Sequence, residues 1–205
     1  MRVSGGFAGL SGVVAAMRSA RFLMLALLAL AGCSGAQPQR DGNPATGTDT
    51  SAQTGATGFT MNSSAFAQDA PIPAEYSCNG RNVPPPLRWH NVPSGAESLA
   101  LVVDDPDAPA GLYVHWVVSG IPPISGEIVD GVLPPTAVVS LNSGGKADYL
   151  GPCPPAGTGV HHYRFQLYAL GTPSALAPTT PVPESTTTIA ARSVAVATAV
   201  GVFGG

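Results

Sequence analysis

Three segments in the second half of the chain carry the hydrophobic patterns of β-strands. Residues 98–103 form a short apolar run that is stopped by acidic residues and a proline, a pattern typical of a buried strand. Residues 112–119 follow a turn and are predicted to form the antiparallel neighbour of the strand at 98–103, with His115 and Trp116 on opposite faces. Apolar and polar side chains alternate along residues 163–170, so one face of that strand packs into a core. The pattern therefore predicts a mostly β fold.

Near the C-terminus, residues 186–199 are rich in Ala and Thr and predict a helix that starts from a Ser or Thr cap, although Thr and Val oppose this assignment. The rest of the composition disfavours further long helices. The chain contains 25 Gly and 21 Pro and is only 10% charged, which favours turns and short strands.

The N-terminal segment has the features of an export signal. Two arginines precede the apolar run 22–30, which is long enough for a signal core and too short to span a bilayer. The run ends in Leu-Ala-Gly-Cys at Cys33, which resembles a bacterial lipobox, so residues 1–33 predict a lipoprotein signal with a lipid on Cys33. An ordinary secretory signal with a chance cysteine is the alternative. Met17 makes a more conventional signal start than Met1.

Between this signal and the first aromatic residues lies a polar segment. Residues 34–57 contain mostly Gly, Thr, Ser, Ala, Gln and Pro, a composition that cannot offset the entropy of ordering. They predict a flexible linker with an end-to-end distance on the order of 25–30 Å. Regular apolar content begins at Phe59, so residues 58–205 predict a single domain, held at the extracytoplasmic face of the cell membrane by the lipid.

The charge of the chain excludes one class of partner. The formal net charge is −3, and three of the nine basic residues precede Cys33, whereas all twelve acidic residues follow it. The segment after Cys33 therefore has a formal charge of −6, with no basic stripe that would attract a polyanion. We expect no nucleic-acid partner.

Two cysteines remain when Cys33 is assigned to the lipid. Cys78 and Cys153 would both lie outside the cytosol, where disulfides persist, so we expect them to pair. A bond closing so long a loop contributes on the order of 4 kcal/mol in the loop-entropy account. Two buried free thiols are the alternative.

Several motifs resemble, in order and spacing, those of the phosphatidylethanolamine-binding proteins, and of their bacterial Raf-kinase-inhibitor-like branch in particular. They are Asp-Asp-Pro-Asp-Ala-Pro at 104–109, His-Trp at 115–116, Gly-Pro-Cys-Pro-Pro at 151–155 and His-His-Tyr at 161–163. The segments 76–80 and 84–89 resemble the same branch. The likeness covers the chain from about Phe59 to its C-terminus.

This resemblance implies a β-sandwich of two antiparallel sheets with short peripheral helices and a small pocket for phosphate-like or carboxylate-like anions. The positions that correspond to the family's pocket are Asp105, Asp107, His115, Pro155, His161 and Tyr163. Two departures stand out: His162 replaces the family's usual Arg, and Phe203 replaces a Tyr in the closing segment.

The chemistry of these residues suits anion binding without a basic cluster. Backbone N–H groups around Gly157 and Gly159, together with imidazole donors, can hold an anion. Asp105 and Asp107 would then fix histidine tautomers and favour protonated rings. If the histidines bind as cations, affinity falls as the pH rises above about 6.5.

Other function classes have weaker support in the sequence. A zinc or manganese site is conceivable, but no HExxH or comparable spacing is present; its ligands would be Asp105, Asp107, His115 and His161. A hydrolase lacks a Gly-x-Ser-x-Gly elbow. We expect a membrane-tethered binding protein for a small anion or a phospholipid headgroup, with no catalytic step and no cofactor. The alternative is a module that inhibits a protease or another protein partner, as the resemblance implies.

Overall fold

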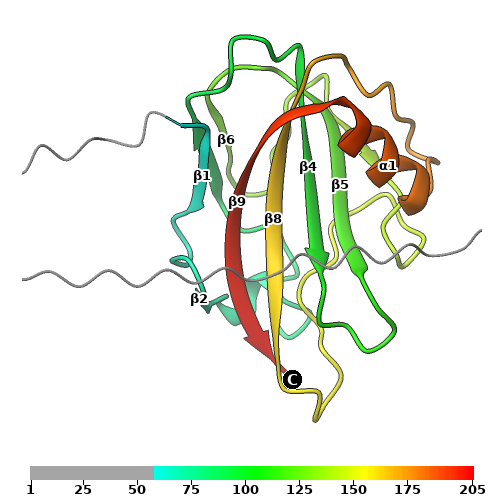
Figure 1. Ribbon diagram of the computed structural model, residues 1–205. Coiled ribbons are helices and arrows are strands. Elements are labelled where there is room, and N and C mark those ends of the chain that lie inside the picture. The colour runs from blue at the N-terminus through cyan, green and yellow to red at the C-terminus, as the bar shows by residue number, and fades with distance from the viewer. Residues whose placement is uncertain (1–57) are drawn as a thin grey trace, which may run out of the picture. The chain divides into compact units, whose positions relative to one another are not determined.

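The computed structural model describes residues 58–205 (Figure 1). The expected signal, the lipidated Cys33, the linker and the start position lie outside these residues. In chain order the elements are β1 (Thr60–Ser63), β2 (Ala70–Pro71), the 3-10 helix η1 (Ala74–Tyr76), β3 (Leu87–His90), β4 (Ser98–Asp105), β5 (Tyr113–Ile121), β6 (Gly126–Ile128), β7 (Val138–Ser140), β8 (Val160–Leu170), α1 (Val182–Arg192) and β9 (Ser193–Gly204).

The strands form two sheets that pack face to face. One sheet has the order β1-β3-β6 and the other the order β2-β9-β8-β4-β5-β7. Apolar side chains from both sheets fill the space between them in one continuous cluster that includes Trp89, Leu101, Trp116 and Phe165. All strand pairs are antiparallel except the short pair β2–β9, which is parallel. The predicted β-sandwich is therefore confirmed, and both tryptophans serve as packing.

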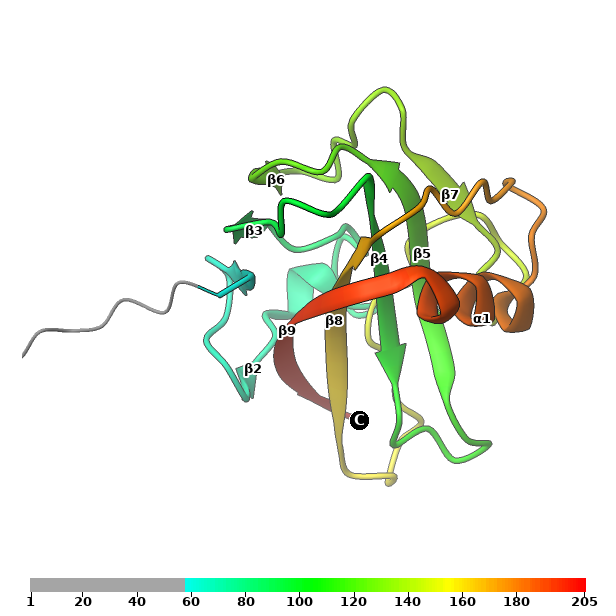
Figure 2. The same cartoon turned by 45° about the horizontal axis from the view of Figure 1, so that its top comes forward.

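The central strands β4, β5 and β8 confirm the three predicted from the hydrophobic pattern, each slightly longer than expected. Every residue of β4 is buried because both of its faces are covered. One face looks into the sandwich, and the other lies on the side of the sheet that α1 covers (Figure 2). On that side Val102 belongs to a buried cluster with Val117 and Ile189. This second contact explains why residues 98–103 are continuously apolar instead of alternating.

The helix expected at 186–199 is only half correct. Helix α1 starts earlier, with proline in its first turn, and ends at Arg192, after which β9 continues to Gly204. Strand β9 pairs with β8 along the whole length of β8, which buries Ala197 and Ala199 and leaves Val194 exposed. The alternation of Val with Ala and Thr suits a strand, and the long partner β8 decides the outcome over the helix propensity of Ala.

The ends of the three central strands meet at one end of the sandwich. Asp105 at the end of β4 lies opposite Tyr113 at the start of β5, and Asp104 lies opposite Arg164 near the start of β8. Two connecting loops, 106–112 and 150–159, meet at this end of the sandwich (Figure 1). Consecutive antiparallel strands thus bring segments far apart in the sequence together.

The loop 150–159 is fixed to the segment around η1. Cys78 and Cys153 form a disulfide, in agreement with the pairing expected from the sequence. The N–H of Gly151 also donates to Oδ1 of Asn82 at 2.8 Å. A Cβ at Gly151 would come within 2.3 Å of the Tyr76 carbonyl oxygen, so the close approach of the two segments requires glycine here.

Candidate functional site

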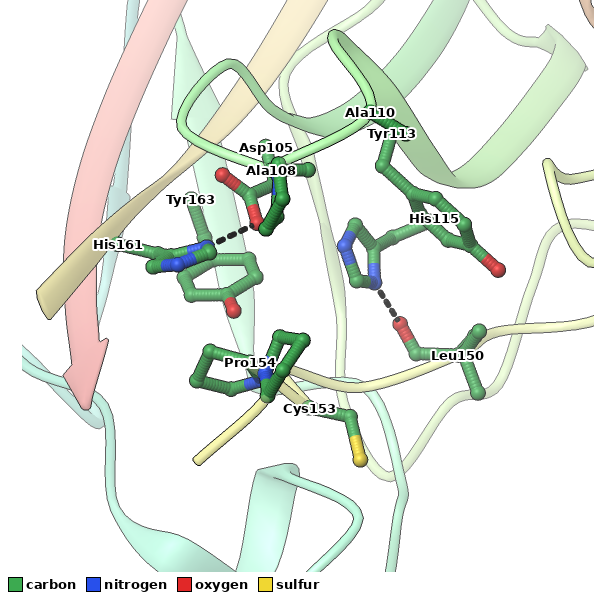
Figure 3. A pocket seen from close by; sticks show the side chains of 12 residues that line it. Asp105, Ala108, Ala110, Tyr113, His115, Leu150, Cys153, Pro154, His161 and Tyr163 are labelled. Carbon is green, nitrogen blue, oxygen red and sulfur yellow. Dashed lines mark hydrogen bonds and ion pairs between the residues drawn. The ribbon is translucent and has the colours of Figure 1, made fainter. Parts of the chain in front are cut away.

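A cavity of about 350 Å³ opens where these loops meet (Figure 3). Most of its wall is apolar, and the polar groups are an aspartate, two tyrosines and two histidines. The lining residues are Asp105, Ala108, Pro109, Ala110, Tyr113, His115, Leu150, Cys153, Pro154, Pro155, His161 and Tyr163. A mostly apolar wall with a few converging polar groups is the usual composition of a ligand pocket.

Asp105 and His161 form a buried pair at one side of the cavity. Nδ1 of His161 lies 2.7 Å from Oδ2 of Asp105, and both side chains are almost fully buried. Nε2 of His161 lies 2.9 Å from the hydroxyl of Thr158, which itself donates to the Pro155 carbonyl at 2.7 Å. Because that hydroxyl has one proton, it accepts from Nε2–H. His161 is therefore held at both ring nitrogens, by Asp105 on one side and by Thr158 on the other.

The proton position on His115 follows from its backbone partner. Its Nδ1 lies 2.8 Å from the carbonyl oxygen of Leu150, which can only accept, so Nδ1 carries the proton. The ring is 5% exposed and packs between the rings of Tyr113 and Tyr163, with centroids 4.9 and 5.2 Å away. Burial lowers the pKa of His115 and outweighs the opposing hydrogen bond to Leu150. The neutral ring therefore presents an unprotonated Nε2 on the side facing the cavity (Figure 3).

The hydroxyl of Tyr163 is a buried donor with no hydrogen-bond partner among residues 58–205. The backbone at Cys153 approaches it without meeting hydrogen-bond geometry. Burial, and secondly the charge of Asp105, raise the pKa of Tyr163, so the hydroxyl keeps its proton. Figure 3 places this hydroxyl beside Pro154, among the lining side chains. A buried donor without a partner is costly, and its presence in a cavity is typical of a binding site.

Five of the six residues expected in the pocket line this cavity: Asp105, His115, Pro155, His161 and Tyr163. Asp107 does not. Its Oδ2 accepts hydrogen bonds from Nδ1 and the backbone N–H of His162, at 2.7 and 2.8 Å, on the exposed surface. These hydrogen bonds lower the pKa of the Asp107 carboxyl. Asp107 thus pairs with a histidine outside the cavity, and the backbone groups expected from Gly157 and Gly159 do not line it either.

The sequence analysis missed Tyr113 and Leu150. Tyr113 lies two residues before His115 on the same strand, so the alternation of side chains placed it on the same face. Leu150 contributes through its backbone carbonyl, for which the sequence gives no signal.

No lysine or arginine within residues 58–205 lines the cavity. The guanidinium of Arg164 binds both carboxylate oxygens of Asp104, at 2.7 and 3.0 Å, away from the cavity lining. This contact raises the pKa of Arg164 and gives Asp104 a structural role. Within residues 58–205 no group of three or more His, Cys, Asp or Glu side chains is arranged to hold a metal ion.

Comparison with known proteins agrees with the fold and with the motifs. The family model of the phosphatidylethanolamine-binding proteins matches residues 62–203. A Mycobacterium tuberculosis protein named "Putative lipoprotein LppC" is 52% identical over 147 residues, which cover 72% of this chain and 73% of that protein.

Two solved structures resemble this chain throughout their own length. YbcL from E. coli, described as a member of the mammalian PEBP family, is 31% identical with a TM-score of 0.67 and covers 71% of this chain and 97% of its own. The PEBP homologue CT736 from Chlamydia trachomatis is 33% identical with a TM-score of 0.66 and covers 72% and 97%. Among the residues described here, no helix has the length and apolar character needed to cross a membrane.

Proposed function

Because this chain belongs to the phosphatidylethanolamine-binding protein family, we propose that its β-sandwich binds a small anionic ligand, phosphate-like or headgroup-like, and catalyses no reaction. The unpaired hydroxyl of Tyr163 is the observation that carries this proposal, because it is a buried donor with no partner among the described residues and belongs to a side chain that lines the cavity. A ligand oxygen that accepts from this hydroxyl removes the cost of leaving it unpaired.

The size and the walls of the cavity fit such a ligand. A volume of about 350 Å³ lies at the small end of the range for ligand sites, roughly 300–1,000 Å³. The apolar side of the wall, which includes Ala108, Pro109 and Leu150, accommodates carbon atoms attached to the anionic group. The ligand class is therefore an anion with a short apolar part, for which a phospholipid headgroup and a free phosphate ester share the chemistry.

The test is a titration of the full-length chain in detergent with inorganic phosphate and with phosphoethanolamine, followed by NMR chemical shifts. Tyr163→Phe removes the free donor and lowers the affinity for either ligand roughly tenfold or more. His162→Gln alters an exposed histidine outside the cavity and serves as the control, with unchanged affinity. If the wild-type chain binds neither compound, the proposal fails.

We also propose that the domain is tethered by a lipid on Cys33 to the extracytoplasmic face of the cell membrane. The signal-like sequence before Cys33 supports this location, and the name of the M. tuberculosis relative is consistent with it. Expression of the full chain in a bacterium tests it. The wild-type chain is expected in the membrane fraction and labelled by a fatty-acid analogue, whereas Cys33→Ser is not labelled. Equal labelling of both would contradict the lipid anchor.

A second candidate function is binding of a protein partner at the same end of the sandwich. Leu112 is 55% exposed and Val160 is 61% exposed. Each directly precedes a residue of the cavity wall, Tyr113 and His161 respectively. Exposed apolar side chains around a pocket are typical of interaction surfaces. Inhibition of a serine protease by the wild-type chain, lost in Leu112→Ser with phosphate binding retained, would support this function. Absence of inhibition by the wild type removes it.

A further inference from the structure

Among residues 58–205 no lysine or arginine lines the cavity, so no side chain of fixed positive charge is free to meet an anion there. Nδ1 of His161 lies 2.7 Å from Oδ2 of Asp105, so any positive charge on this imidazole is matched by the carboxyl group beside it. The guanidinium of Arg164 is bound to Asp104 and does not line the cavity. An anion that enters alone would thus meet no net positive charge in the wall, so the loss of its hydration would go uncompensated.

His115 is the other imidazole in the wall, and its orientation is fixed by the backbone. Nδ1–H donates to the Leu150 carbonyl, which leaves the lone pair of Nε2 facing the cavity (Figure 3). In this form Nε2 is an acceptor and repels a ligand oxygen that is also an acceptor. One proton placed between Nε2 and the ligand turns this repulsion into a charge-assisted hydrogen bond.

We propose that the cavity binds its anion together with one proton, held between Nε2 of His115 and a ligand oxygen, so that His115 determines which protonation form is bound. This inference rests on the proposed function and adds the charge state of the bound ligand to it. The hydroxyl of Tyr163 supplies a second hydrogen bond, which needs no change in protonation.

The groups around His115 favour this position for the proton. They are Asp104 and Asp105 of β4, Tyr113 of β5, and His161 and Tyr163 of β8. Asp105 is the competing acceptor, but its Oδ1 accepts from the N–H of Asp107 at 2.8 Å and its Oδ2 accepts from His161. Both oxygens of Asp105 therefore already have hydrogen-bond partners within the chain. The charges of Asp104 and Asp105 favour a protonated His115, against the effect of its burial.

The sign of the pH dependence follows from the two states of His115. Burial lowers its pKa in the free site, and a bound anion raises it. Between these two pKa values binding takes up a proton, so affinity falls about tenfold for each unit of rising pH. Above the pKa of the bound state the dependence disappears, and below the pKa of the free site it also disappears.

Two anions distinguish the sources of the proton. Phosphate esters titrate near neutral pH and can bring a proton of their own, whereas sulfate remains fully ionised. The experiment is calorimetric titration of the full-length chain in detergent with sulfate and with phosphate, at pH 7, in buffers of different ionisation enthalpy. We expect sulfate to bind with uptake of about one proton. Binding of phosphate either takes up one proton from solution or brings in a phosphate that is already protonated. The pH dependence of the phosphate affinity distinguishes these two cases.

The variant His115→Gln keeps a polar side chain that cannot titrate. It is expected to bind sulfate at least tenfold more weakly at pH 6, with no proton uptake, while His162→Gln, which alters an exposed histidine, behaves as wild type. If His115→Gln does not fold, the ¹⁵N shift of Nε2 in the wild-type chain decides: sulfate must convert it from an unprotonated to a protonated nitrogen.

The outcomes separate this inference from the proposed function. Binding of sulfate and phosphate without proton uptake, with an affinity that is flat from pH 5 to 8, overturns the inference and leaves the proposed function standing. Proton uptake that persists in His115→Gln also overturns it. Absence of binding of either anion throughout this pH range overturns both.

Discussion

Tyr163→Phe separates stability from binding in a single substitution. The side chain is buried in the core, and the change removes only the hydroxyl, which lacks a hydrogen-bond partner among the described residues. A buried polar group without a partner costs about 1–3 kcal/mol, so its removal is expected to leave the free energy of unfolding unchanged or to raise it by up to about 1 kcal/mol. The same change removes the donor for the ligand and weakens binding.

The assay is denaturant unfolding of the full-length chain with and without phosphate, monitored by tryptophan fluorescence. Without ligand, Tyr163→Phe should be at least as stable as the wild type. With the same excess of phosphate, the wild type should gain more stability than the variant, because the stabilisation by a ligand that binds the folded state grows with the logarithm of the ligand concentration divided by its Kd. A loss of more than about 1 kcal/mol without ligand would refute the reasoning, because it would show that the hydroxyl makes a stabilising bond in the folded domain.

Three further predictions concern the stability that the contacts in and around the site contribute. Asp105→Asn breaks a buried pair and is expected to lower the free energy of unfolding by about 3–5 kcal/mol. Asp107→Asn breaks an exposed pair and is expected to lower it by less than about 1 kcal/mol. Equal losses of the two variants in chemical denaturation would contradict this difference. Reduction of the disulfide should lower stability by up to about 4 kcal/mol, and an unchanged unfolding midpoint would argue against it. Gly151→Ala should destabilise the chain by more than about 1 kcal/mol, because the added Cβ meets the backbone around η1. Gly95→Ala is the control, because open space surrounds Gly95, and it should not destabilise the chain. The thermal unfolding midpoints of the two variants test this difference.

Much of the fold could be predicted from local patterns. The strands β4, β5 and β8 bury side chains at positions that alternation or continuous apolar character already marks, because a strand in a sandwich must place its apolar side chains inside. The boundary between α1 and β9 could not be predicted in this way. Residues 193–199 suit either state locally, and pairing with β8, far away in the sequence, decides between them.

The sequence by itself predicted four of the polar side chains that line the cavity, since motifs in the loops and strand ends mark Asp105, His115, His161 and Tyr163. Only the tertiary structure decided what each of them does. The carbonyl of Leu150 fixes the tautomer of His115, and the carboxyl group of Asp105 holds Nδ1 of His161. These roles depend on contacts between distant segments and on backbone atoms, which every residue has and no sequence pattern distinguishes.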